Sequence, residues 1–472
     1  MSKSMTPPHV YTRRSLSGAV RLALAMAALS ATGVAAAQQA PAPADEETPT
    51  LETVSVLGTR SKPRTEASSA APIDILGGEE LQNQPSVDML DKLRVLVPSY
   101  NVSTIPIDDA ATLVRPANLR GLPPDNTLVL VNGKRRHRAA VITFLGRGLS
   151  DGAQGPDISV FPSMALEQVE VLRDGAAAQY GSDAIAGVIN FGLKRADEGG
   201  QVEAFGGRYY EGDGDTLQFG AQVGLGLLDN GFATLTAEWR TADATSRSVQ
   251  RDDAAAVAAA GYPGVRNPAQ IWGSPETDHD FKFVYNLGFT GENVDTYLFG
   301  NVARREVIGG FYYRNPTTRA GVYSNDGGQT LLVGDTNTAN AVTCPSIALR
   351  DASGNLIPYS TVNAAVTALP AECFTFLRSR PGGFTPNFGG QMEDASIVGG
   401  IKGDLGGWSW DLSASWGRNE IDFFIVNTVN ASLGPNQPAG ARFEPGGNVQ
   451  TDTAVNFDIS RDFNVGFAAG PL

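Results

Sequence analysis

Apolar and polar residues alternate from Gln201 to near the end of this chain, in runs that turns separate. Successive side chains of a β-strand point to opposite faces, so each run predicts a strand with one apolar and one polar face. In the run 216–228, one face carries Leu217, Phe219, Ala221, Val223, Leu225 and Leu227. The pattern predicts about eight strands, starting near residues 201, 216, 232, 279, 294, 394, 408 and 451.

The connections between these strands decide between a soluble β-sandwich and a membrane barrel. Tight turns are expected at 229–231, 291–293 and 406–407, and long segments near 244–277, 314–393 and 430–450. Short and long connections that alternate in this way are typical of outer-membrane barrels. After the N-terminus no run approaches the ~20 apolar residues that a spanning helix needs. A membrane role would therefore use antiparallel β-strands.

The N-terminus has the pattern of an export signal. A basic region that ends at Arg21 precedes the apolar run 22–29, and Ala35 and Ala37 form a cleavage site before Gln38. We assign 1–37 to a signal peptide and leave its export route, Sec or twin-arginine, open. The exported chain has only two cysteines, Cys344 and Cys373, and we expect them to form a disulfide within the long segment that holds both. Two free thiols are the alternative.

Composition and motifs argue against several classes of function. A net charge of -14 disfavours a nucleic-acid partner, because phosphate binding needs clustered Lys and Arg. Three histidines give no cluster of metal ligands, so no metal site or cofactor is expected. The segment 148–152 matches the G-x-S-x-G pattern around Ser150, but Gly-rich loop flanks it where a strand and a helix are needed. We therefore predict no catalytic residues; a surface esterase is the weaker alternative.

Four segments before the strands carry a family resemblance: PIDILGGEEL (72–81), NLRGL (118–122), TLVLVNGKR (127–135) and QVEVLRDGAAAQYGSDAIAGVIN (168–190). Together with the island ETVSV (52–56), which follows a Pro-rich and acidic stretch, they resemble TonB-dependent outer-membrane receptors. The resemblance implies a linker with the TonB box at 38–60, a small α+β plug domain at 61–197 and the first part of a β-barrel at 198–472. The expected fold class is thus mainly β, with about eight of some 22 barrel strands.

The resemblance also assigns roles to residues. A short β-prone segment on a flexible tether can add a strand to a partner's sheet edge, so the TonB-binding residues are expected to be Glu52, Thr53, Val54, Ser55 and Val56. Plug loops that face the cargo are expected to present Arg136, His137, Arg138, Thr143, Arg147 and Ser150; a loop with no fixed contact is the alternative. Contacts that fasten the plug to the barrel are assigned to Arg120, Arg173 and Asp174. The alternative is that these residues form ordinary surface salt bridges.

The function that the resemblance implies is active uptake of a scarce solute across the outer membrane of a Gram-negative bacterium. TonB and its energising complex would be the partners, outer-membrane lipid the surroundings, and a metal chelate such as a ferric siderophore the default cargo. A truncated plug protein that only binds TonB is the alternative. Eight strands enclose a lumen only wide enough for side chains, so we expect this chain alone to form an incomplete barrel, and we expect no signalling domain in 38–50.

Overall fold

The computed structural model describes residues 54–55, 64–65, 72–102, 104–143, 151–337, 339, 341–437 and 441–463. The predicted signal peptide and most of the predicted linker lie outside these ranges. Within them, no helix has both the length and the apolar character needed to cross a membrane.

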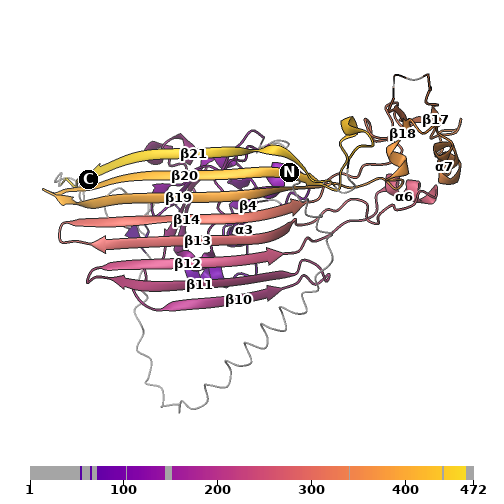
Figure 1. Cartoon of the computed structure of the whole chain (residues 1–472). Helices are drawn as coiled ribbons and strands as arrows, with labels where there is room; N and C mark the ends of the chain where they lie inside the picture. The colour runs from indigo at the N-terminus through magenta and orange to yellow at the C-terminus, as the bar shows by residue number, and fades with distance from the viewer. Residues whose placement is uncertain are drawn as a thin grey trace, which may run out of the picture. The chain divides into compact units, whose positions relative to one another are not determined.

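One antiparallel sheet of eight strands, the large sheet, is built from strands between Gly200 and Ser460 (Figure 1). Its order follows the sequence: β10 (Gly200–Gly207), β11 (Thr216–Leu227), β12 (Gly231–Ala242), β13 (Glu276–Thr290), β14 (Val294–Gly309), β19 (Asn387–Leu405), β20 (Trp408–Val426) and β21 (Phe443–Ser460). Within the described residues β10 and β21 each pair with one neighbour, so the sheet is open. The eight strands and the alternation of short and long connections are confirmed.

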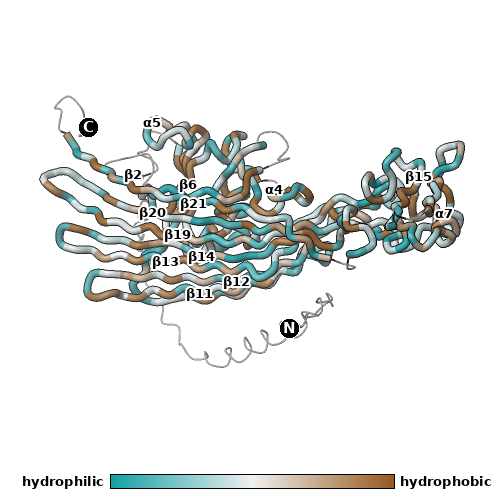
Figure 2. Tube along the Cα trace, turned by 45° about the horizontal axis from the view of Figure 1, so that its top comes forward, coloured by the Kyte–Doolittle hydropathy of each residue, from teal (hydrophilic) through white to brown (hydrophobic). Residues whose placement is uncertain are grey.

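The large sheet buries its polar face and exposes its apolar face. On β11, Gln218 and Gln222 are buried, whereas Phe219 and Val223 are each 39% exposed. On β13, Lys282 is 2% exposed beside an exposed Phe281. Figure 2 shows hydrophobic and hydrophilic residues interleaved along these strands. A soluble sandwich buries its apolar face, so this burial is the inverse of what that alternative requires.

A small α+β domain precedes the large sheet and packs on its polar face; we call it the plug, after the resemblance above. Its five-stranded sheet has the order β3-β8-β9-β6-β7, in which β6 and β9 are parallel and the other pairs antiparallel. The elements are β3 (Ile73–Gly77), α2 (Gly78–Gln82), α3 (Met89–Leu96), β4 (Tyr100–Val102), α4 (Ala110–Leu113), β5 (Ala117–Leu119), η2 (Pro124–Asn126), β6 (Thr127–Val131), β7 (Lys134–Arg135), η3 (Ser163–Ala165), β8 (Leu166–Leu172), α5 (Ala177–Tyr180), η4 (Ser182–Ala184) and β9 (Gly187–Leu193).

Local sequence explains two features of the plug. Asp88 caps α3, because its side chain accepts a hydrogen bond from the amide of Leu90, and the buried face of that helix carries Leu90 and Leu93. Asn132 and Gly133 both have positive φ, 48° and 79°, which makes the two-residue turn between β6 and β7. That turn directs the basic segment 134–138 back toward the large sheet.

Two long connections, 243–275 and 310–386, pack together beyond the strand ends and form what we call the loop unit (Figure 1). It has its own buried cluster, which includes Val257 from the first connection and Tyr323 from the second. The amide of Tyr359 donates to the carbonyl of Ala260 across the two connections. Its elements are α6 (Asp252–Ala259), β15 (Thr330–Leu331), β16 (Gly334–Asp335), β17 (Ile347–Ala348), α7 (Tyr359–Thr367), β18 (Cys373–Phe374) and η5 (Phe376–Arg378); η6 (Ala431–Leu433) lies in the connection after β20.

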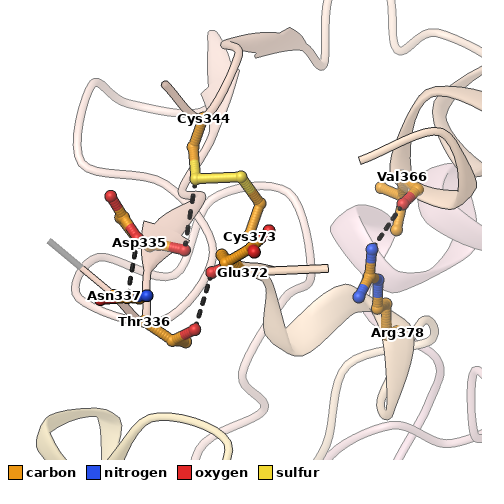
Figure 3. The surroundings of a disulfide bond; sticks show 9 residues. Asp335, Thr336, Asn337, Cys344, Val366, Glu372, Cys373 and Arg378 are labelled. Carbon is orange, nitrogen blue, oxygen red and sulfur yellow. Dashed lines mark hydrogen bonds between the residues drawn. A yellow bond between two sulfur atoms is a disulfide. The ribbon is translucent and has the colours of Figure 1, made fainter. Parts of the chain in front are cut away.

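The disulfide that the sequence predicts is present in the loop unit. Cys344 and Cys373 are bonded, with their Cα atoms 5.6 Å apart, and Figure 3 shows the bond beside the β16–β18 pair. The bond closes a loop of 29 positions within the second long connection. The bond joins Cys344, which lies outside the regular elements, to β18, the strand that follows α7.

Replacing both cysteines by alanine should loosen the loop unit without disturbing the plug. In the chain-entropy model a loop of this length contributes about 3–4 kcal/mol. We expect proteolysis within 310–386 to accelerate, and cleavage within the plug to keep its rate; mapping fragments by mass spectrometry measures both. Equal cleavage of the loop unit in the parent and the double variant would contradict the prediction.

Candidate functional site at the plug interface

The predicted TonB box lies only partly within the described residues. Val54 and Ser55 form β1 (Val54–Ser55), which pairs antiparallel with β2 (Arg64–Thr65). Glu52, Thr53 and Val56 lie outside the described residues. A two-residue β-bridge fits a segment that can form a strand with an external edge, but the role of these five residues stays a prediction.

The basic segment after β7 runs along the polar face of the large sheet. Arg136 and His137 are each 7% exposed, and both bind the carboxylate of Asp394 on β19. The Arg136 guanidinium also donates to Asn301 on β14 at 2.7 Å and to Ser396 at 2.9 Å. The contact between His137 and Asp394 joins segments 257 positions apart in the sequence.

The Asp394 carboxylate has partners on both of its oxygens. Oδ1 accepts from Arg136 and, at 2.8 Å, from Asn301. Oδ2 accepts from His137 Nε2 and from Asn419, each at 2.9 Å. A buried carboxylate is costly unless it is paired and hydrogen-bonded, and here both conditions hold. We call this cluster the Asp394 anchor.

His137 fits the anchor because β20 has a glycine opposite it. A Cβ atom on Gly417 would lie 2.2 Å from Nδ1 of the His137 ring. Burial and the neighbouring charge of Arg136 lower the pKa of His137, against the opposing effect of Asp394. The ring is therefore neutral at pH 7, and its Nε2–H donates to Asp394.

The other predicted cargo-facing residues fall in different places. Arg138 is exposed and lines a cavity of about 520 Å³ between the segment after β7 and the strands β20 and β21, with Trp416 and Asp452 on the strand side. Thr143 is buried and lines a smaller cavity within the plug. Arg147 and Ser150 lie outside the described residues. A cargo-facing role for this set stays a prediction, although the structure places Arg136 and His137 against the sheet.

The residues assigned to fastening the plug have partners within the plug. Arg120 lies 3.7 Å from Asp174, and both side chains are exposed. Arg173 pairs with Asp74 at 2.6 Å, because the pairing of β3 with β8 brings the ends of these strands together. Among the described contacts these pairs brace the plug's own sheet, so their role at the barrel wall stays a prediction.

A second cluster of plug–sheet contacts was not anticipated. Asp157 of the plug pairs with Arg305 on β14 at 2.6 Å, and Asp88 lies 3.9 Å from Arg240 on β12. Burial alone would raise the pKa of Asp88, but the charges of Arg115 and Arg240 lower it well below its usual range, so it is ionised. Charged residues at polar-face positions of predicted strands were the available signal in the sequence.

Two observations on the described residues concern the chemistry of the site. No group of three or more His, Cys, Asp or Glu residues there could hold a metal ion. Ser150 of the G-x-S-x-G match lies outside them, and His137 is held by Asp394. The arrangement can bind two parts of one chain to each other through charge, and beside that contact lies a cavity lined by both polar and apolar residues.

Comparisons with known proteins agree with this architecture. Residues 65–188 match the family model described as TonB-dependent Receptor Plug Domain. The chain is 34% identical over 140 residues to the ferric enterobactin receptor PirA of Pseudomonas aeruginosa, covering 30% of this chain and 18% of that protein. It is 32% identical over 145 residues to the vitamin B12 transporter BtuB of Vibrio vulnificus, covering 31% and 21%.

A solved structure extends the likeness to the large sheet. A crystal structure of a mutant ferric enterobactin receptor of Pseudomonas aeruginosa superposes with a TM-score of 0.51 at 15% identity, covering 85% of this chain and 48% of that one. The chain thus spans about half the length of that receptor, and at this identity the likeness concerns the fold. The plug is thus similar in sequence to the plug domains of TonB-dependent receptors, and the chain, including its large sheet, is similar in fold to about half of one such receptor.

Proposed function

We propose that this chain is part of an outer-membrane receptor that imports a ferric siderophore with energy delivered by TonB. The observation that carries the proposal is the plug packed on the polar face of a sheet whose apolar face is exposed. An apolar outer face suits lipid, and a polar inner face filled by a plug suits a closed conduit. Relatives named as ferric enterobactin receptors support a siderophore as the cargo; one named as a vitamin B12 transporter is the reason to test a second cargo.

The contacts at the interface fit a plug that must stay closed until it is pulled. Asp394 on the sheet holds Arg136 and His137, and Arg305 holds Asp157, so these ion pairs exist only while the plug is seated. Breaking such buried pairs is costly, which keeps the conduit shut at rest. TonB would bind the β1 segment by strand addition and supply the work that separates these pairs.

Val54→Pro should abolish uptake while cargo binding persists. Proline has no amide hydrogen, so a strand donor at the centre of the TonB box disappears. Uptake of radiolabelled ferric enterobactin should fall to that of a strain without TonB, and equilibrium binding to isolated membranes should match the parent. Val54→Thr keeps the amide and the β-branched shape and serves as the matched control.

The same assay separates the parts of the proposal. Normal uptake by the Val54→Pro protein would contradict coupling through this segment. Parent protein that binds cyanocobalamin and not ferric enterobactin would contradict the siderophore as cargo and leave TonB coupling standing.

A further inference from the structure

The plug contacts the large sheet through two adjoining patches of opposite charge. The first, the basic patch, consists of Arg240 on β12, Lys282 on β13 and Arg305 on β14, all at most 6% exposed. Two carboxylates of the same sheet, Asp280 and Glu238, pair with part of this charge. The plug supplies the remaining partners, Asp157 and Asp88, as described above.

The second, the acidic patch, consists of Asp394 on β19, Asp411 on β20 and Asp458 on β21. Here the plug supplies the cations. Lys134 lies 3.1 Å from both Asp411 and Asp458, and Arg136 and His137 bind Asp394. In the ion pairs that cross the interface, the plug therefore contributes carboxylates to β12–β14 and cations to β19–β21.

Strand order makes the boundary between the patches sharp. β14 and β19 are neighbours, and their register places Ala303 opposite Asp394, with Arg305 two residues farther along β14. Neighbouring strands lie about 4.8 Å apart. A plug displaced by one or two strands would bring Arg136 toward Arg305, or Asp157 toward Asp394. Like charges would then meet where water is scarce, and such contacts suppress wrong pairings.

Uncharged contacts across the interface lack this selectivity. Asn132 meets Asn286 at 3.4 Å, and Gln154 meets Gln450 at 3.1 Å. Side-chain amides both donate and accept hydrogen bonds, so they can also find partners when the plug is displaced by one or two strands. We propose that the two patches act as an electrostatic register, which fixes the one position along the wall in which the plug seats. The proposal concerns assembly of the chain and does not depend on uptake or on the cargo.

Charge reversal with a reporter crosslink tests the register. The full chain carries Asn132→Cys and Asn286→Cys, and a short thiol-reactive crosslinker measures how often these positions meet; mass spectrometry of the linked peptides excludes pairing with Cys344 or Cys373. Asp157→Arg alone and Arg305→Asp alone should each lower the crosslinking rate at least about tenfold, since like charges then face each other. The double reversal should recover it to within about twofold, because opposite charges meet again.

A neighbouring reversal controls for charge changes in the sheet as such. Arg304 precedes Arg305, its side chain is 66% exposed, and it pairs with Glu393. Arg304→Asp should leave the crosslinking rate unchanged. The register would be refuted by single reversals that crosslink like the parent. A double reversal no better than either single one, in protein that still forms the Cys344–Cys373 bond, would refute it too.

Discussion

Asp394→Ala should release the plug from the large sheet at a cost of about 3–5 kcal/mol, the range for removing one partner of a buried ion pair. The change leaves the Arg136 guanidinium buried at 7% exposure, with neutral acceptors only. Asn301 and Asn419 also lose an acceptor each. We expect the plug to become sensitive to protease under conditions in which the parent plug resists.

Two variants give this experiment its controls. Glu393→Ala removes the adjacent carboxylate on the same strand, whose side chain is 55% exposed, and should change protease resistance little, since exposed ion pairs contribute about 0–1 kcal/mol. Asp394→Asn keeps the shape without the charge and should fall between the parent and Asp394→Ala. Equal resistance of the Asp394→Ala and Glu393→Ala proteins would rule out the anchor.

The sequence predicted the strands well because period two is a local signal. For β10, β11, β12, β13, β14 and β20, the predicted start lies within three residues of the observed one. The predicted start of β19 is seven residues too late, and β21 starts at Phe443 rather than near 451. The early part of β19 was missed because Gly389 and Gly390 carry no side chains that could alternate. Likewise Pro445, Gly446 and Gly447 near the start of β21 are typical of a loop.

The interface could be predicted only in outline. The basic residues 134–138 stood out, but a positive charge suits an anionic cargo and a buried carboxylate equally well, and the partner of Arg136 lies 258 positions away. The sequence predicted long connections but not that they pack into a loop unit. The core of this unit comes from short pieces of two connections, whose apolar residues follow no common periodicity. Contacts between distant segments depend on which strands are neighbours in the sheet and on how the plug packs against it. A single sequence does not contain this information in a readable form.

Gly417→Ala should unseat His137, because the added methyl group would occupy the space of the imidazole. The new Cβ would lie 2.2 Å from Nδ1 and 2.4 Å from Cγ of that ring, far inside van der Waals contact. Overpacking of this kind costs about 1–3 kcal/mol, and the displaced ring also stops donating to Asp394. Protease resistance of the plug should therefore drop, although the substitution adds a single methyl group to the sheet.

The second-site variant His137→Ala makes the cause testable. It removes the ring that clashes, so Gly417→Ala should cost little in that background, and the two substitutions should be less harmful together than the sum of their separate effects. Gly399→Ala on β19 is the matched control, since its Cβ would first meet Leu298 at an ordinary 3.4 Å. Strictly additive losses in protease resistance, or a Gly399→Ala protein as weak as Gly417→Ala, would show that steric exclusion of His137 is not the reason for glycine at position 417.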